Sequence, residues 1–236
     1  MKKLFLVFIC CFSLSANAQL VKYCMTYADF VADNWTPIEA LTEGRTNQAC
    51  QIKFDDDMFK FKTGDKEADK IIKKEVLAIM YGDQLFVNCR NLRRNEVQLD
   101  SNDYAKAFRF NGDKICLLGY KINNAAFLAS LGADVAGFLV NDRWVSAGLF
   151  AGSSAIWMDK DLWHKYVCYL LDSEANEKGR TEVVQITDEV MENLLADTPE
   201  LFLKYMGVES KCKRQAASNV LPILMEKGLV DDGVDD

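Results

Sequence analysis

The sequence has little of what most catalytic and nucleic-acid-binding sites need. Its 236 residues include a single histidine, His164, so any catalytic triad or multi-histidine metal site would have to use it. No two cysteines are spaced as C-x-x-C, which removes the main support for thioredoxin-like redox chemistry and for a zinc knuckle. Lys and Arg number 28 against 35 Asp and Glu, a net charge of −7. An acidic chain repels phosphate, so we expect no nucleic-acid partner, and no motif predicts a cofactor or a metal.

Long apolar runs are also missing. The longest near the start, Leu4–Phe12, is about half of the roughly 20 residues that a membrane-spanning helix needs. Lys2 and Lys3 precede it, and the small residues of Ala16–Ala18 follow it. A basic start, a short apolar middle and a small-x-small end are typical of a secretory signal peptide. We therefore predict cleavage between Ala18 and Gln19, and export to the periplasm or the extracellular space.

Export would place the remaining cysteines in an oxidising compartment. Six of them follow the predicted cleavage site, and an even count permits three disulfides, although the sequence alone does not choose among the 15 pairings. The alternative is that several are small buried hydrophobic residues, because a chain of this length can be stable through its core alone. The sequence leaves both readings open for Cys24, Cys50, Cys89, Cys116, Cys168 and Cys212.

Three pairs of short apolar runs predict β-hairpins over roughly residues 50–121. Each pair encloses residues that favour turns, and Asn111-Gly112 is the strongest such dipeptide because both residues tolerate positive φ. Upstream, Thr26 and Asp29 form a capping box for a helical turn over Tyr27–Ala32, and Asp33–Gln48 reads as a loop. The predicted hairpins are Gln51–Phe54 with Met58–Lys62, Val76–Tyr81 with Leu85–Cys89, and Tyr104–Phe110 with Lys114–Tyr120.

The segment Ala125–Met158 is rich in small and apolar residues. Gly148 and Gly152 have the spacing of close helix contacts in membranes, so a membrane-inserting helical pair is one hypothesis. A buried hairpin of Gly137–Val140 and Trp144–Leu149 is the one we favour, since short apolar runs are commonly core.

The C-terminal third predicts a strand pair and then helices. Lys165–Leu171 and Glu182–Ile186 read as paired strands. Thr187 and Thr198 are expected to cap two helices, the second starting with proline and ending by Gly207. A third helix is expected from about Ser210, with Cys212, Ala216, Val220 and Leu224 on one face and Pro222 ending or kinking it.

Together these elements predict an α+β fold, an antiparallel sheet built from successive hairpins with two or three helices at the C-terminus. The expected division of the chain is a signal peptide over 1–18, a hairpin region over 19–124, the apolar segment and strand pair over 125–186, helices over 187–230 packed on the same domain, and an acidic tail over 231–236.

The order of segments resembles an uncharacterised family of exported proteins from Bacteroidetes-type bacteria. The marks are Tyr27-Ala28-Asp29-Phe30, the hairpin Tyr81–Asn88 ahead of the apolar segment, and the late strand pair before Leu194-Leu195, Pro199-Glu200-Leu201 and the final helix. The resemblance covers most of the mature chain and implies compartment and architecture. It implies no activity and no catalytic residue.

Candidate site residues gather between Trp144 and His164. Trp144, Trp157 and Trp163 lie within twenty residues of one another beside His164, and clustered aromatic rings can bind sugars or peptides, although they also fill cores. His164 also has Cys168 four residues away, which could be a ligand pair or an activated thiol.

Three functional hypotheses follow. The leading one is a non-catalytic envelope or periplasmic protein that binds a protein, glycan or lipid surface. The second is an envelope hydrolase that uses His164, and the third is a membrane-associated protein that attaches through Ala125–Met158.

Overall fold

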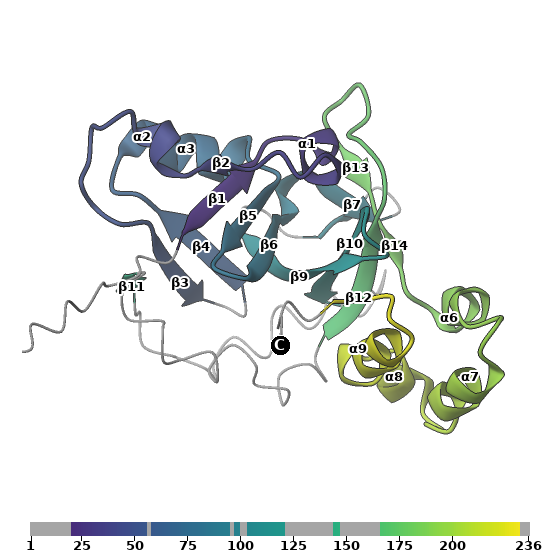
Figure 1. Ribbon diagram of the computed structural model, residues 1–236. Coiled ribbons are helices and arrows are strands. Elements are labelled where there is room, and N and C mark those ends of the chain that lie inside the picture. The colour runs from purple at the N-terminus through teal and green to yellow at the C-terminus, as the bar shows by residue number, and fades with distance from the viewer. Residues whose placement is uncertain are drawn as a thin grey trace, which may run out of the picture.

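A computed structural model describes residues 20–55, 58–94, 97–99, 103–120, 144–146 and 166–231. A large, strongly twisted antiparallel sheet forms the centre, with short helices at one end and four C-terminal helices at the other (Figure 1). This arrangement confirms the predicted α+β class.

The large sheet has eleven strands in the described part of the chain, and every pairing in it is antiparallel. Its main path runs β11-β3-β4-β9-β6-β5-β1-β2, and β10, β12 and β14 continue from the other end of β9. The strands are β1 Val21–Cys24, β2 Thr36–Pro37, β3 Gln51–Asp55, β4 Met58–Lys62, β5 Ala78–Tyr81, β6 Gln84–Asn88, β9 Tyr104–Phe110, β10 Lys114–Tyr120, β11 Trp144–Ser146, β12 Tyr166–Leu171 and β14 Val184–Gln185.

The three predicted hairpins are present as β3–β4, β5–β6 and β9–β10. At the β9–β10 turn, Asn111 and Gly112 have φ values of 49° and 84°, the left-handed conformation that asparagine and glycine tolerate. The hairpins are not arranged in sequence order, because β9 lies between β4 and β6. The predicted late strand pair is also present, as β12 with β14.

A second, three-stranded sheet lies beside the first. It pairs β7 Leu92–Arg94 with β8 Val97–Gln98 and, in parallel, with β13 Thr181–Glu182. The chain passes from β13 to β14 through Val183, whose N–H donates to the Arg93 carbonyl at 2.8 Å. The segment after β12 therefore ties the two sheets together.

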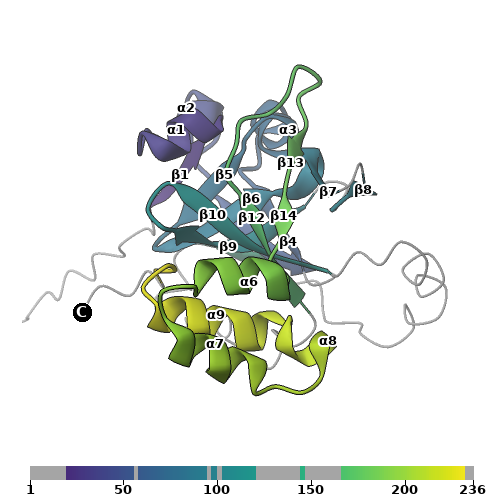
Figure 2. The ribbon, with the colours of Figure 1, turned by 90° about the vertical axis from the view of Figure 1, so that its right-hand side faces the viewer.

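Helices lie at both ends of the sheet. Figure 2 shows α6 to α9 gathered below the sheet and α1 to α3 above it. The helices are α1 Tyr27–Val31, α2 Glu39–Thr42, α3 Lys66–Lys74, the 3-10 helix η1 Cys89–Asn91, α6 Asp188–Leu194, α7 Pro199–Met206, α8 Lys211–Arg214 and α9 Ala217–Glu226.

Two local expectations were wrong. Asp33–Gln48 is not all loop, because it contains β2 and α2. The expected third C-terminal helix is two helices, α8 and α9, and Pro222 does not end the second one, which continues to Glu226. Pro222 is exposed while Leu221 and Ile223 on either side of it are buried, so packing stabilises the helix through the proline.

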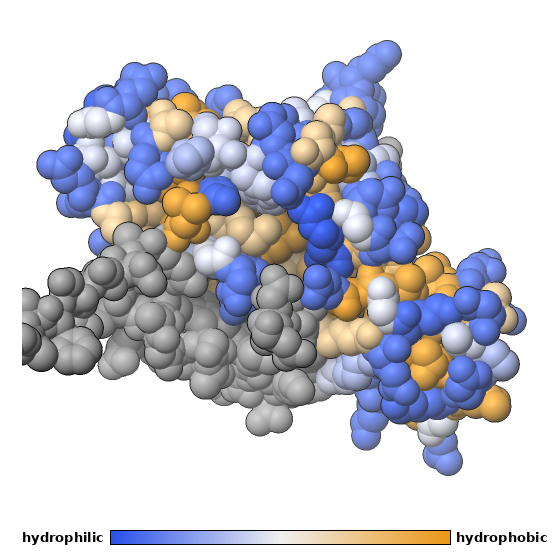
Figure 3. All heavy atoms as spheres, viewed as in Figure 1, coloured by the Kyte–Doolittle hydropathy of each residue, from blue (hydrophilic) through white to orange (hydrophobic). Residues whose placement is uncertain are grey.

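The apolar side chains form three clusters. One lies between the α6, α7 and α9 helices and the end of β9 with β10 and β12, and a second lies between α2, α3 and the β3–β4 and β5–β6 hairpins. The third covers the opposite face of the sheet, where Phe30 of α1 is fully buried. The surface over the helices is mostly hydrophilic, with hydrophobic patches showing between helices and sheet (Figure 3).

Most of Ala125–Met158 lies outside the described residues, as do the predicted signal peptide and residues 232–236. The exception is β11, which covers part of the expected strand Trp144–Leu149 and pairs with β3. Within the described ranges, no helix has the length and apolar character needed to cross a membrane.

Candidate functional site

Of the four site residues predicted from the sequence, only Trp144 lies within the described residues. Trp144 begins β11, where its backbone lies opposite Lys53 of β3. Trp157, Trp163 and His164 lie outside the described residues, so their proposed grouping stays a prediction.

Cys168, the suggested thiol partner of His164, is fully buried in β12. Burial raises its pKa well above the usual range, and a hydrogen bond with Cys116 raises it further. A thiol must ionise to act as a nucleophile or a metal ligand, so Cys168 is held in its unreactive form.

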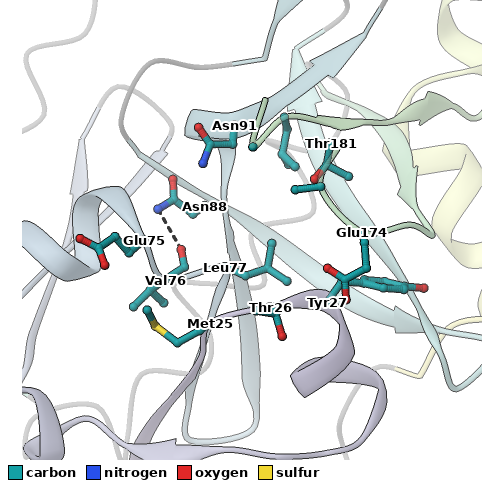
Figure 4. Close-up of a pocket in the computed structure, with 13 residues that line it drawn as sticks. Met25, Thr26, Tyr27, Glu75, Val76, Leu77, Asn88, Asn91, Glu174 and Thr181 are labelled. Atoms are coloured by element: carbon teal, nitrogen blue, oxygen red, sulfur yellow. Dashed lines mark hydrogen bonds between the residues drawn. The ribbon is translucent and has the colours of Figure 1, made fainter. Parts of the chain in front are cut away.

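A polar hollow of about 110 Å³ lies where four segments meet (Figure 4). One is the start of α1, a second is the turn after α3, a third is the end of β6 with η1, and the last is the loop between β12 and β13. Two glutamates, two asparagines and two threonines are among its lining residues, and none of the lining residues is basic.

Asn88 fixes the back of this hollow. Its buried amide donates to three carbonyls at the end of α3, those of Ile72, Lys73 and Val76, at 3.0 to 3.3 Å. Its side-chain oxygen accepts from the Arg90 N–H at 3.0 Å and so caps η1. One side chain therefore satisfies the C-terminal carbonyls of one helix and the N-terminus of another.

The α1 side of the hollow is fixed by a capping box and by two long-range bonds. Thr26 accepts from the Asp29 N–H at 3.0 Å while the Asp29 carboxylate accepts from Thr26, as predicted from the sequence. Glu174 accepts from the Ala28 N–H, and the Tyr27 hydroxyl donates to the Asp113 carbonyl at 2.8 Å. These contacts hold α1 against the β9–β10 turn and against the loop after β12.

The electrostatic environment of the hollow is negative near Tyr27. Burial raises the pKa of the Tyr27 phenol, and the carboxylates of Asp113, Asp172 and Glu174 raise it further. The hydrogen bond from Thr26 is the main reason why the pKa of Asp29 is lowered. Tyr27 therefore stays protonated and Asp29 stays ionised at neutral pH.

Four more of the described thiols are also structural. None of the six described cysteines forms a disulfide, and all except Cys212 are buried. Burial raises the pKa values of Cys24 and Cys50 to about 12. The buried-hydrophobe reading of the sequence thus fits five of the six cysteines.

The hollow offers groups that can form hydrogen bonds. The buried Asn88 already bonds to backbone groups, and the exposed side chains of Asn91 and Glu75 lie at the rim. No group of three or more His, Cys, Asp or Glu side chains in the described ranges could hold a metal ion. The sequence does not predict this site, although the Tyr81–Asn88 hairpin that ends in Asn88 is one mark of the family resemblance.

Residues 22–230 match Family of unknown function (DUF6563). The chain belongs to this family. The match spans nearly all of the described large sheet, the polar hollow and the C-terminal helices. It assigns no activity, source or compartment, and the export expected from residues 1–18 stays a prediction. No curated protein and no solved structure matches the chain.

Proposed function

We propose that this DUF6563 chain is an exported, non-catalytic binding protein of the envelope or periplasm that engages a surface component through the polar hollow. The predicted signal peptide supports the location. The hollow supports binding, because preformed concave sites with a few fixed polar groups are typical of ligand recognition.

The observation that carries the proposal is the rigid support of the hollow. Asn88, Tyr27 and Glu174 hold its walls through hydrogen bonds between segments that are far apart in the sequence. Asn91 and Glu75 remain at the exposed rim, where an amide and a carboxylate can meet an incoming group. Rigid walls lower the entropy that a partner loses on binding.

The location can be tested directly. We expect the full-length chain, expressed in a Gram-negative host with its own start, to appear in the periplasmic or culture fraction with Gln19 as its first residue. A variant with Lys2, Lys3 and the Leu4–Phe12 run disrupted should stay in the cytoplasm at full length. Intact full-length protein in the cytoplasm of the unaltered strain would overturn the export part of the proposal.

Binding at the hollow can be tested by placing a photo-cross-linking amino acid at position 91 of the exported chain. Lys70 on the exposed face of α3 provides the control position, since it does not line the hollow. We expect a discrete adduct from position 91 and not from position 70. Partners other than proteins need two further assays. The unaltered chain and the double variant Glu75→Ala/Asn91→Ala are tested for binding to glycan arrays and to vesicles of phosphatidylethanolamine and phosphatidylglycerol.

These assays also separate the alternatives. Retention by a glycan or by vesicles that the double variant loses would support the proposal and identify the ligand class. The proposal would be overturned if position 91 gave no adduct that position 70 lacks and if the unaltered chain and the double variant behaved equally toward glycans and vesicles. Activity on an ester, amide or glycoside panel that disappears in folded His164→Ala would instead favour the hydrolase hypothesis.

A further inference from the structure

The polar hollow contains a buried hydroxyl that has no partner. Thr181 of β13 lines the hollow and is only 5% exposed, yet its hydroxyl makes no hydrogen bond to any described residue. In Figure 4 no dashed line reaches it. Leaving a buried polar group without a partner costs free energy. A ligand that forms a hydrogen bond with Thr181 would therefore gain more there than at a side chain in contact with water.

Glu174 adds a carboxylate with one oxygen to spare. Its Oε1 accepts from the Ala28 N–H at the start of α1, and its other oxygen has no partner in the described part of the chain. Four basic residues are next to lining residues in the chain but do not line the hollow themselves, namely Lys74, Arg90, Lys178 and Arg180. The Glu174 charge therefore remains available to a cation that enters the hollow.

The loop between β12 and β13 is closed on itself just before Thr181. The Asn176 side-chain oxygen accepts from the Lys178 and Arg180 N–H groups at 2.9 and 3.1 Å. The Asn176 N–H in turn donates to the Arg180 carbonyl at 2.8 Å. This closed turn separates Glu174 from Thr181, so it fixes the spacing of the two side chains.

The remaining walls of the hollow are largely apolar. Val76 and Leu92 are buried, and Met25 and Leu77 also line it. Its volume of about 110 Å³ is small beside the roughly 300 to 1,000 Å³ of pockets that enclose whole drug-sized ligands. The hollow therefore fits the end of a chain better than a sugar ring. Apolar walls beside polar acceptors suit an aliphatic stem that carries a charged tip.

We propose that the polar hollow binds a primary ammonium group at the end of an aliphatic stem, as on a lysine side chain. This inference rests on the proposed function and names the chemical group that the hollow takes. An ammonium donates three hydrogen bonds and accepts none. The hollow offers acceptors of matching kind in the second Glu174 oxygen, the Thr181 hydroxyl and the exposed Asn91 amide, and no lining residue is basic (Figure 4).

The test is a titration of the full chain with Nα-acetyl-lysine methylamide at constant ionic strength, followed by backbone amide chemical shifts. We expect saturable shifts over residues 174–181 and about tenfold weaker binding in Glu174→Gln, whose side-chain oxygen can still accept from the Ala28 N–H. Thr181→Val, which removes the hydroxyl at similar size, should also weaken binding. The matched control is Glu177→Gln, which removes the same charge from an exposed position of the loop that does not line the hollow. Thermal unfolding checks that all three variants are folded.

Two analogues of the probe separate the charge from the stem. Nα-acetyl-norleucine methylamide keeps an apolar stem without the ammonium, and the Nε-acetylated lysine probe keeps the nitrogen without its charge. Both should bind about tenfold more weakly than the lysine probe, because hydrogen bonds to charged groups are stronger than those to neutral ones. Equal binding of the norleucine probe, or equal weakening in Glu174→Gln and Glu177→Gln, would overturn the ammonium proposal.

A second arm identifies the source of the amine. n-Pentylamine and a peptide with one central lysine between glycines are titrated in the same way. Tighter binding of the peptide would assign a lysine of a partner protein, and equal binding would assign a free alkylamine. An adduct from position 91 without saturable binding of any of these amines would overturn the ammonium proposal, while the hollow would remain a binding site as proposed above. Amine binding that Glu174→Gln weakens would support the ammonium proposal even without such an adduct.

Discussion

Arg214 and Asp188 form a two-point ion pair that joins α8 to the first turn of α6. The Arg214 Nη2 lies 2.7 Å from one Asp188 oxygen, and its Nε lies 3.3 Å from the other. Tyr205 of α7 donates its hydroxyl to the same carboxylate at 2.8 Å, and the Gln215 amide does so at 3.1 Å. One carboxylate thus connects three of the four C-terminal helices.

Removing the arginine should destabilise the protein strongly. The Arg214 side chain is only 10% exposed and that of Asp188 is 26% exposed, so Arg214→Ala leaves a largely desolvated carboxylate without its counter-charge. We expect a loss of about 3 kcal/mol in the free energy of unfolding, measured by urea denaturation. Arg45→Ala provides the control, because Arg45 pairs with Glu43 and Asp65 at the surface and is 43% exposed. Equal losses in the two variants would contradict this account.

The same carboxylate should contribute to acid unfolding. Its hydrogen bond with Arg214, and then those with Tyr205 and Gln215, lower the pKa of Asp188 from 3.8 to about 2. A lowered pKa in the folded state stabilises the fold above the unfolded value, and this contribution disappears as the pH falls from about 4 to 2. It amounts to roughly 2 kcal/mol. Asp188→Asn should therefore be less stable at neutral pH and lose less stability between pH 4 and 2, which urea titrations at each pH would measure.

The three hairpins were predictable because their signals are local. Asn111-Gly112 needs no distant contact to favour its turn, and its strands have the predicted bounds. The insertion of β9 between β4 and β6 has no comparable local signal, since strand neighbours are chosen by tertiary packing. For the same reason α9 continues through Pro222, where buried neighbours outweigh the helix-breaking tendency of proline.

The polar hollow was not predictable for a related reason. The polar hollow combines Thr26, Asn88 and Glu174, which are far apart in the sequence, and only the local part, the Thr26–Asp29 capping box, was predictable. At the C-terminal helices, Thr187 and Thr198 stand at the predicted N-cap positions, but neither side chain makes a capping hydrogen bond. The sequence pattern therefore predicted where these helices begin, but it did not predict which hydrogen bonds stabilise their first turns.

We expect the Asn88 side chain to stabilise the fold and that of its neighbour Asn91 to contribute little to stability. Asn88→Ala leaves the carbonyls at the end of α3 without their side-chain donor and removes the cap of η1, so we expect a loss of about 2 to 3 kcal/mol in the free energy of unfolding. Asn88→Asp should be similarly harmful, because a carboxylate cannot donate to those carbonyls. Asn91→Ala, on the exposed rim of the same hollow, should unfold as the unaltered chain does. A stable Asn88→Ala chain would show that the amide is not needed to hold the hollow.

The six described thiols should divide into one reactive group and five protected ones. Cys212 is exposed on α8, whereas Cys24, Cys50, Cys89, Cys116 and Cys168 are buried. Alkylation of the reduced native protein, mapped by mass spectrometry of peptides, should therefore label Cys212 first, with the buried cysteines at least a hundredfold slower because they need local or global unfolding to react. In 6 M guanidinium chloride all of them should react together. Cys212→Ser should remove the fast reaction and leave the slow ones unchanged. Rapid native labelling of Cys116 or Cys168 would mean that β10 and β12 separate far more readily than their six paired positions and covering helices imply.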